Sequence, residues 1–239
     1  PGVLVQPGAK TIGVDIPMTT LLDHALDTMP MPPSGSPRGP DRLVSTLAVD
    51  LGSGQFAALP LGAVTTLLPI SGPVSFIGVP ALGGTLSGAS YDLTEAAVTG
   101  ESQSAPASVV AGVETTNAND PLAVTGFLPV PALIQPSAAA WTGTHVAMQA
   151  SGPIDLAVVQ ISSGGGLVIW QIVAPGSDLS FDVPDLSQVP DVASLVHGPI
   201  STSFAVARID SFDYGRLRYG HLSSAAWSAY ALDTAAGSY

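Results

Sequence analysis

Residues 208–221 concentrate charged and aromatic side chains in a chain that is otherwise poor in both. Three of the six basic residues of the protein lie here, Arg208, Arg216 and Arg218. The same segment holds Asp210, Phe212, Asp213, Tyr214, Tyr219 and His221. Arginine–carboxylate pairs can tie neighbouring strands together, whereas Arg and Tyr are also favoured at binding hot spots. We favour the structural role and name as the candidate recognition patch Arg208, Asp210, Asp213, Tyr214, Arg216, Arg218 and Tyr219.

A second group of polar residues has the composition of a calcium site. Glu114, Asn117, Asn119 and Asp120 place four oxygen-bearing side chains within seven residues. Hard cations such as Ca²⁺ prefer carboxylate and amide oxygens. The competing interpretation is an ordinary Asx turn, because Asn and Asp here precede Pro121. Calcium is therefore the only cofactor that we consider, and the turn is the stronger interpretation.

Signatures of catalysis are weak. The four histidines show no zinc-binding spacing, and no GxSxG nucleophile motif occurs. The residue types of a Ser–His–Asp triad are present in Asp210, Asp213, His221, Ser223 and Ser224. Glycoside hydrolysis would need a pair of carboxylates in a cleft, for which the glutamates are Glu95, Glu101 and Glu114, with Trp141, Trp170 and Trp227 as stacking groups. Residue types alone do not make a site, so we assign no catalytic residue and expect no enzyme.

The composition of the 239 residues excludes several classes of protein. A net charge of −12 disfavours nucleic acids and anionic membrane surfaces as partners. The absence of Cys excludes disulfides, thiolate metal sites and a Cys nucleophile. With 22 Pro, 26 Gly and 10% charged residues, a helical bundle is disfavoured. The longest strongly apolar run, residues 167–174, is too short for a membrane-spanning helix. Because the chain begins at Pro1 rather than Met, we expect a processed product, a fragment or a trimmed chain.

The elements that must position these residues are short β-strands. Apolar residues alternate with polar ones over residues 12–16, 43–51, 146–150, 179–183 and 200–206. Such a period of two is typical of half-buried strands. Residues 154–161 and 167–173 are apolar on both faces and are separated by Ser162–Gly166, which predicts a hairpin at the centre of the molecule. The proline-rich residues 30–40 predict an extended surface loop.

Two segments are ambiguous between strand and helix. Residues 20–29 carry Leu22, Ala25, Leu26 and Met29 at helical spacing, but the same residues also alternate as in a strand. Residues 223–236 are rich in Ala, which favours a terminal helix capped by Ser223 or Ser224.

An internal similarity suggests a duplication. The segment FIGVPAL at residues 76–82 resembles FLPVPAL at residues 127–133, and FDVPDL at residues 181–186 is a shorter version. Such a period can mean stacked β-units, here around residues 60–110 and 111–165. Chance similarity among strands that end at Val-Pro is the other interpretation.

Several stretches resemble a known group of proteins. They are Ala48–Ser53, Phe127–Leu133, Ile161–Trp170, Asp210–Gly215, Tyr214–Tyr219 and Ala229–Asp233. These stretches resemble the C-terminal, β-rich region of uncharacterised exported proteins and predicted lipoproteins of myxobacterial type. The resemblance implies export and association with the cell surface or outer membrane. It carries over no catalytic residue.

Together these observations predict an all-β antiparallel sandwich, immunoglobulin-like or jelly-roll-like, as one β-rich unit over residues 1–239 or as two tightly packed β-modules. We expect a non-enzymatic, secreted or surface-associated structural or adhesive protein that self-assembles or binds another surface component. A glycan- or calcium-binding β-module is one alternative, and a secreted hydrolase is another.

Overall fold

The computed structural model describes all residues except 1–21, 34–38, 137–140 and 185–188. The first seven strands are β1 (His24–Pro30), β2 (Arg42–Asp50), β3 (Phe56–Leu67), β4 (Val74–Val79), β5 (Ser90–Thr99), β6 (Ser104–Thr115) and β7 (Leu122–Val124). The next seven are β8 (Ala132–Gln135), β9 (His145–Gln149), β10 (Leu156–Ser163), β11 (Val168–Pro175), β12 (Ser180–Asp182), β13 (Pro199–Arg208) and β14 (Ala229–Ser238). The helices are short 3₁₀ turns: η1 (Gly84–Leu86), η2 (Gly164–Gly166), η3 (Tyr214–Arg216), η4 (Tyr219–Leu222) and η5 (Ser224–Ala226). No helix in this part of the chain is long and apolar enough to cross a membrane.

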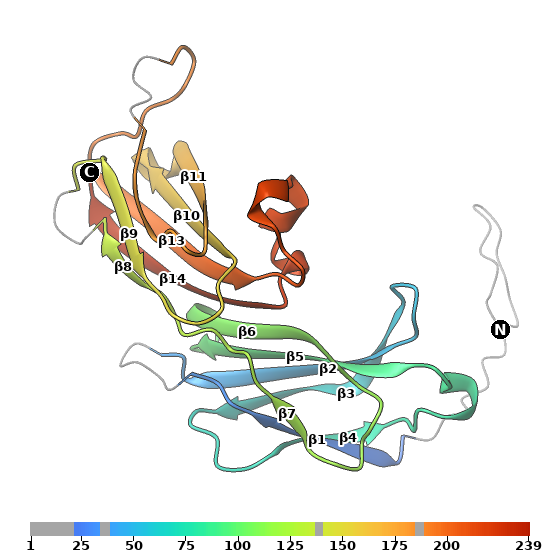
Figure 1. Ribbon diagram of the computed structural model, residues 1–239. Coiled ribbons are helices and arrows are strands. Elements are labelled where there is room, and N and C mark those ends of the chain that lie inside the picture. The colour runs from blue at the N-terminus through green and yellow to red at the C-terminus, as the bar shows by residue number, and fades with distance from the viewer. Residues whose placement is uncertain (1–21, 34–38, 137–140, 185–188) are drawn as a thin grey trace, which may run out of the picture.

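One eight-stranded sheet, in the order β11-β10-β13-β14-β6-β5-β2-β3, runs through the whole molecule. A three-stranded sheet, β4-β1-β7, covers one half of it, and a second, β12-β9-β8, covers the other half (Figure 1). The facing sheets share buried side chains, such as Leu26 and Phe76 with Leu47 and Leu93 in the first half. The fold is therefore an all-β antiparallel sandwich built in two halves, as the sequence predicts.

The two halves repeat the same strand order with an offset of eight strands. In the large sheet, β3-β2-β5-β6 corresponds to β11-β10-β13-β14, and in the small sheets β4-β1 corresponds to β12-β9. Each half is a Greek-key sandwich with an immunoglobulin-like strand order. The halves differ beside β1 and β9, where β7 pairs in parallel with β1 but β8 pairs antiparallel with β9. We call residues 24–124 the first sandwich and residues 132–238 the second sandwich.

The sandwiches are joined edge to edge through β6 and β14. Only four residue pairs form this ladder, from Ala229 opposite Val110 to Leu232 opposite Ala107. We call this junction the seam. Buried side chains of both sandwiches nevertheless form one continuous cluster, which includes Leu93 and Phe204. The seam is therefore narrow in hydrogen bonds but continuous in its core.

The described strands follow the predicted alternation. In β13, Ile200, Thr202, Phe204 and Val206 point inward and are buried. The alternating residues 43–51, 146–150 and 179–183 fall largely within β2, β9 and β12, whereas residues 12–16 lie outside the described part.

Strand replaces helix in both ambiguous segments. Residues 24–30 form β1, which pairs with β4 and β7. The predicted terminal helix at residues 223–236 is wrong, because only η5 is helical there and β14 begins at Ala229. Strand β14 is paired on both sides, with β13 and with β6, and Ala229 and Ala231 fill narrow core positions. Tertiary pairing thus overrides the helical preference of alanine.

The predicted hairpin exists, but its place in the sheet differs from the expectation. Strands β10 and β11 pair in register around η2. Only β10 is central, because β11 is the outermost strand of the large sheet. The apolar outer residues of β11, such as Ile169, therefore face solvent.

The three similar sequence segments, residues 76–82, 127–133 and 181–186, do not all lie in corresponding strands of the fold. Residues 76–79 belong to β4, whereas residues 127–131 belong to the connector between the sandwiches, residues 125–131, which leads into β8. Phe181 lies in β12, which corresponds to β4 in the strand order. The two sandwiches thus begin and end elsewhere than residues 60–110 and 111–165.

Candidate functional site

The loop between β13 and β14, residues 209–228, is built around its own small core. Ile209 and Trp227 are buried with Leu156, Val158 and Ala207 of the sheet, and Phe212, Leu217 and Leu222 pack against them. The indole Nε1 of Trp227 donates to the carbonyl of His221 at 2.8 Å. Because large apolar side chains and an indole hydrogen bond fix it, this loop is an ordered platform.

Three of the seven residues of the candidate recognition patch anchor this loop. The Tyr214 hydroxyl donates to the carbonyl of Val173 in β11 at 3.0 Å. The Asp213 carboxylate accepts from the backbone N–H of Gly215 at 2.9 Å and thereby caps η3. The Asp210 carboxylate accepts from the Ser228 hydroxyl at 2.9 Å. These three side chains thus make hydrogen bonds within the protein that hold the loop in place.

The other residues of the patch face solvent. Tyr219 is 89% exposed, and the side chain of Arg216 is 86% exposed and lies 3.5 Å from Asp213. Arg218 is also exposed. Of the four basic residues that the structure describes, Arg208, Arg216 and Arg218 lie in this region, so the loop is the most cationic part of the described surface. Whether it recognises a partner stays a prediction.

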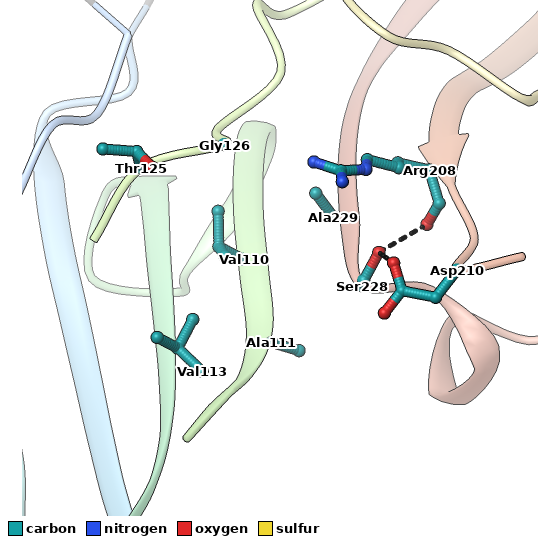
Figure 2. Close-up of a pocket in the computed structure, with 9 residues that line it drawn as sticks. All are labelled: Val110, Ala111, Val113, Thr125, Gly126, Arg208, Asp210, Ser228 and Ala229. Carbon is teal, nitrogen blue, oxygen red and sulfur yellow. Dashed lines mark hydrogen bonds between the residues drawn. The ribbon is translucent and has the colours of Figure 1, made fainter. Parts of the chain in front are cut away.

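A cavity of about 150 Å³ lies beside the base of this loop, at the seam. We call it the seam cavity. Its walls come from β6, the connector and the two ends of the β13–β14 loop, and the lining residues are Val110, Ala111, Val113, Thr125, Gly126, Arg208, Asp210, Ser228 and Ala229. Figure 2 shows the Arg208 side chain reaching across Ala229 toward Gly126, with Ser228 and Asp210 on the same side as Arg208 and Val110 and Val113 on the side opposite. A larger hollow of about 390 Å³ lies on the opposite face of the seam, where Ala107, Val109, Tyr230 and Leu232 line it.

The residues of the calcium prediction do not form one cluster. Glu114 lies opposite Asp92 in the β5–β6 ladder. In the loop after β6, the Asn117 amide donates to Asp120 at 3.0 Å and accepts from the backbone of Asn119 at 2.9 Å. These are the hydrogen bonds of an Asx turn. Within the described residues, no three acidic or histidine side chains gather in a way that could hold a metal ion. Calcium binding stays a prediction without a geometric site.

A Ser–His–Asp arrangement occurs where the sequence does not suggest one. Across the β12–β9 pair, His145 Nδ1 lies 2.9 Å from an oxygen of Asp182, and its Nε2 lies 3.1 Å from the Ser180 hydroxyl. This is the connectivity of a hydrolase triad. The three side chains lie on the open outer face of the small sheet, and Asp182 is 91% exposed. Both described hollows lie elsewhere, at the seam.

One carboxyl group is buried in the core of the first sandwich. Glu95 of β5 is 0% exposed and accepts hydrogen bonds from Thr28 of β1, at 3.1 Å, and from Ser45 of β2. Burial raises the pKa of Glu95 above its usual value, and the two hydroxyl donors oppose that rise. Glu95 cannot meet a saccharide, so it does not serve the glycosidase alternative. It joins the two sheets of the first sandwich.

Three acidic residues, Asp50, Asp92 and Glu114, lie close together on the outer face of the first sandwich and affect the pKa of Asp92. The pKa of Asp92 is raised, chiefly by burial and further by the nearby carboxylates of Glu114 and Asp50. These three residues disfavour binding of anions at this face.

Sequence reasoning could not find the Ser–His–Asp arrangement or the seam cavity. His145 is 35 residues from Ser180, and the register of β9 against β12 brings them together. The cavity depends on β14 pairing with β6, which are more than 110 residues apart along the chain. The alternation of residues 179–183 does predict that Ser180 and Asp182 share one face, but not that His145 joins them.

No family model matches the chain, and no curated protein matches it. Among solved structures, a segment of two fibronectin type-III domains from chicken tenascin is similar over 78% of this chain and 90% of that chain. The sequence identity is 13% and the TM-score is 0.27. The strand pairing described above, rather than this distant likeness, defines the fold.

Proposed function

We propose that this chain is an exported, non-enzymatic structural or adhesive protein that associates with further copies of itself through the free edge of β11. The observation that carries the proposal is the character of this edge. β11 spans eight residues, and residues 156–177, which form its hairpin, contain no charged side chain. An open, uncharged, apolar edge strand is a template for pairing with another chain.

The other outer edge of the same sheet is protected. β3 contains Pro60, and residues 59–62 bulge out between the pairs formed by Ala58 and Ala63. A proline and a bulge both interrupt edge pairing. Leu61 also lies near Gly78 of β4, with its Cδ1 3.9 Å from the position that a Cβ on Gly78 would occupy. β11 has no proline or bulge before its last residue, Pro175. The β13–β14 loop touches it where the Tyr214 hydroxyl donates to the Val173 carbonyl, so the proposed pairing uses residues 168–172.

The distribution of charge also favours association through the β11 edge. A net charge of −12 makes most approaches between two copies repulsive. The repulsion is smallest at the uncharged β10–β11 hairpin. The seam gives a precedent within the molecule, because β6 and β14 already join two sandwiches edge to edge.

The experiment measures the mass of the particle in solution by analytical ultracentrifugation over a range of concentrations. Wild type should exceed the 24.0 kDa of one chain as concentration rises. Ile169→Lys adds a charge to β11 at a side chain that is 56% exposed, and should restore the monomer. Thr65→Lys is the matched control, since it adds the same charge to an exposed position of β3 and should leave association unchanged. A monomeric wild type, or association that survives Ile169→Lys, contradicts the proposal.

A secreted hydrolase is the second candidate, and the Ser180–His145–Asp182 arrangement favours it. A triad works by excluding water and by stabilising an oxyanion with preorganised donors. The exposed carboxylate of Asp182 supports the non-enzymatic proposal instead, because water competes for the hydrogen bond that would orient His145. Labelling with a fluorophosphonate separates the two candidates. Wild type should label no more than Ser180→Ala, and labelling that is lost in both Ser180→Ala and His145→Ala would establish the hydrolase.

A further inference from the structure

We propose that the seam cavity binds the carboxylate of an acidic saccharide, with Arg208 as the counter-ion and Asp210 as an acceptor for a sugar hydroxyl. This site is separate from the β11 edge, so neither proposal depends on the other. The proposal rests on the positions of Arg208, Asp210 and the apolar residues that face them.

The Arg208 guanidinium lines a cavity and has no acidic partner among the described residues. Acidic residues outnumber basic ones eighteen to six, yet no hydrogen bond or ion pair joins the Arg208 guanidinium to a residue of the described part. Its Nη1 lies 4.0 Å from the point where a side chain on Gly126 would begin. The connector thus leaves open the space in front of the guanidinium, and Figure 2 shows the group directed into this space.

The nearest carboxylate in sequence is already engaged. One oxygen of Asp210 accepts the Ser228 hydroxyl at 2.9 Å, and the same hydroxyl lies 3.3 Å from the Arg208 carbonyl. Ser228 therefore holds Asp210 in place on the same side of the cavity as Arg208. This side of the cavity presents a donor, the Arg208 guanidinium, and an acceptor, the Asp210 carboxylate.

The wall that faces these two groups is apolar. Val110 and Val113 line it, and the buried Ala229 lies next to the guanidinium. A sugar acid matches this set of groups, since it carries a carboxylate, an apolar C–H face on its ring and hydroxyls. Arginine recognises a carboxylate with two parallel hydrogen bonds. The position at the junction of two sandwiches is also a common place for ligand sites. A cavity of about 150 Å³ admits one such residue rather than an oligosaccharide.

The ligand arm of the test uses D-galacturonate, its methyl ester and D-galactose, with binding followed by isothermal titration calorimetry on the full chain. Galacturonate should bind saturably at millimolar concentration. The methyl ester and galactose lack the negative charge and should bind about tenfold more weakly or worse. Absence of saturable binding, or equal binding of the acid and its ester, overturns the proposal without any variant.

The protein arm assigns the site. Arg208→Gln should weaken galacturonate binding about tenfold or more, and Arg208→Lys should restore part of it. Asp210→Asn should weaken the binding of both galacturonate and galactose, because it alters the acceptor for hydroxyls.

Arg218→Gln is the control. It removes the same charge from the neighbouring loop without touching the cavity, and this variant should bind galacturonate as wild type does. Equal losses in Arg208→Gln and Arg218→Gln would show general attraction to a cationic loop and would overturn the assignment. Circular dichroism and the melting temperature verify that each variant is folded.

Discussion

The two sandwiches share a strand order but fill corresponding places with different chemistry. β5 of the first sandwich carries the buried Glu95, which two hydroxyls hold. β13, its counterpart, contains no carboxylate and fills the core with Phe204 instead. The turn before each strand differs as well. The Tyr91 hydroxyl donates to the Pro80 carbonyl at 2.6 Å, an arrangement that matches the tyrosine corner of immunoglobulin-like sandwiches.

The second sandwich fixes the corresponding connection with other groups. The indole of Trp170 donates to the carbonyl of Ala193 at 3.0 Å, and the Ser163 hydroxyl accepts from the backbone of Val196 at 2.9 Å. One topology therefore tolerates two sets of stabilising contacts. The shared strand order requires buried side chains along the strand and a fixed connection before it. Different residues meet these two requirements in the two sandwiches.

The largest expected effect is on the apolar core of the second sandwich. Phe204→Ala removes a fully buried ring and leaves a cavity, so we expect the free energy of unfolding to fall by about 3–5 kcal/mol. Urea unfolding measures the loss. Ser203→Ala, at the exposed neighbouring position of β13, is the control and should change it by less than about 0.5 kcal/mol. Phe204→Leu keeps the test open if the alanine variant does not fold. Equal stability of the Phe204 variants and the control would mean that this residue does not support the second core.

The polar core of the first sandwich should respond to pH. Because burial raises the pKa of folded Glu95, the stabilisation that its protonated form provides is fully present below the unfolded value of about 4.3. It is lost as pH rises through the folded pKa. Glu95→Gln has no such loss, so wild type should lose stability relative to this variant between acidic and neutral pH. Urea midpoints of the two proteins across this range give the difference. Parallel curves would mean that the pKa of Glu95 is the same in the folded and the unfolded protein, so that burial does not raise it.

The smallest expected effect is at the tyrosine corner. Tyr91→Phe keeps the ring and removes one hydrogen bond, so the loss should be about 1 kcal/mol. Tyr219→Phe, at the exposed loop, should leave the unfolding midpoint where it is. If the two variants behave alike, the corner contributes its ring and not its hydroxyl.

The alternation of neighbouring residues predicts the strands, but it does not predict which strands pair with one another. The alternation from Ile200 to Val206 is a property of neighbouring residues, so it predicted β13 correctly. Whether an apolar strand is central or outermost depends on a partner elsewhere in the chain. The sequence therefore predicts a central hairpin, whereas β11 is the outermost strand of the large sheet. The same limit applies to function. The sequence showed that Arg208, Asp210 and Tyr214 are close in the chain, but only the fold separates anchors from exposed groups and places Arg208 in a cavity.

The narrow seam has a mechanical consequence. A load applied between β3 and β11 would pass through every ladder of the large sheet in turn. The β6–β14 ladder has four residue pairs, against eight in β10–β11 and ten in β13–β14. It should therefore open before the others and extend the molecule while each sandwich stays folded. A protein that holds surfaces together could yield at this point under strain and close again when the strain is released.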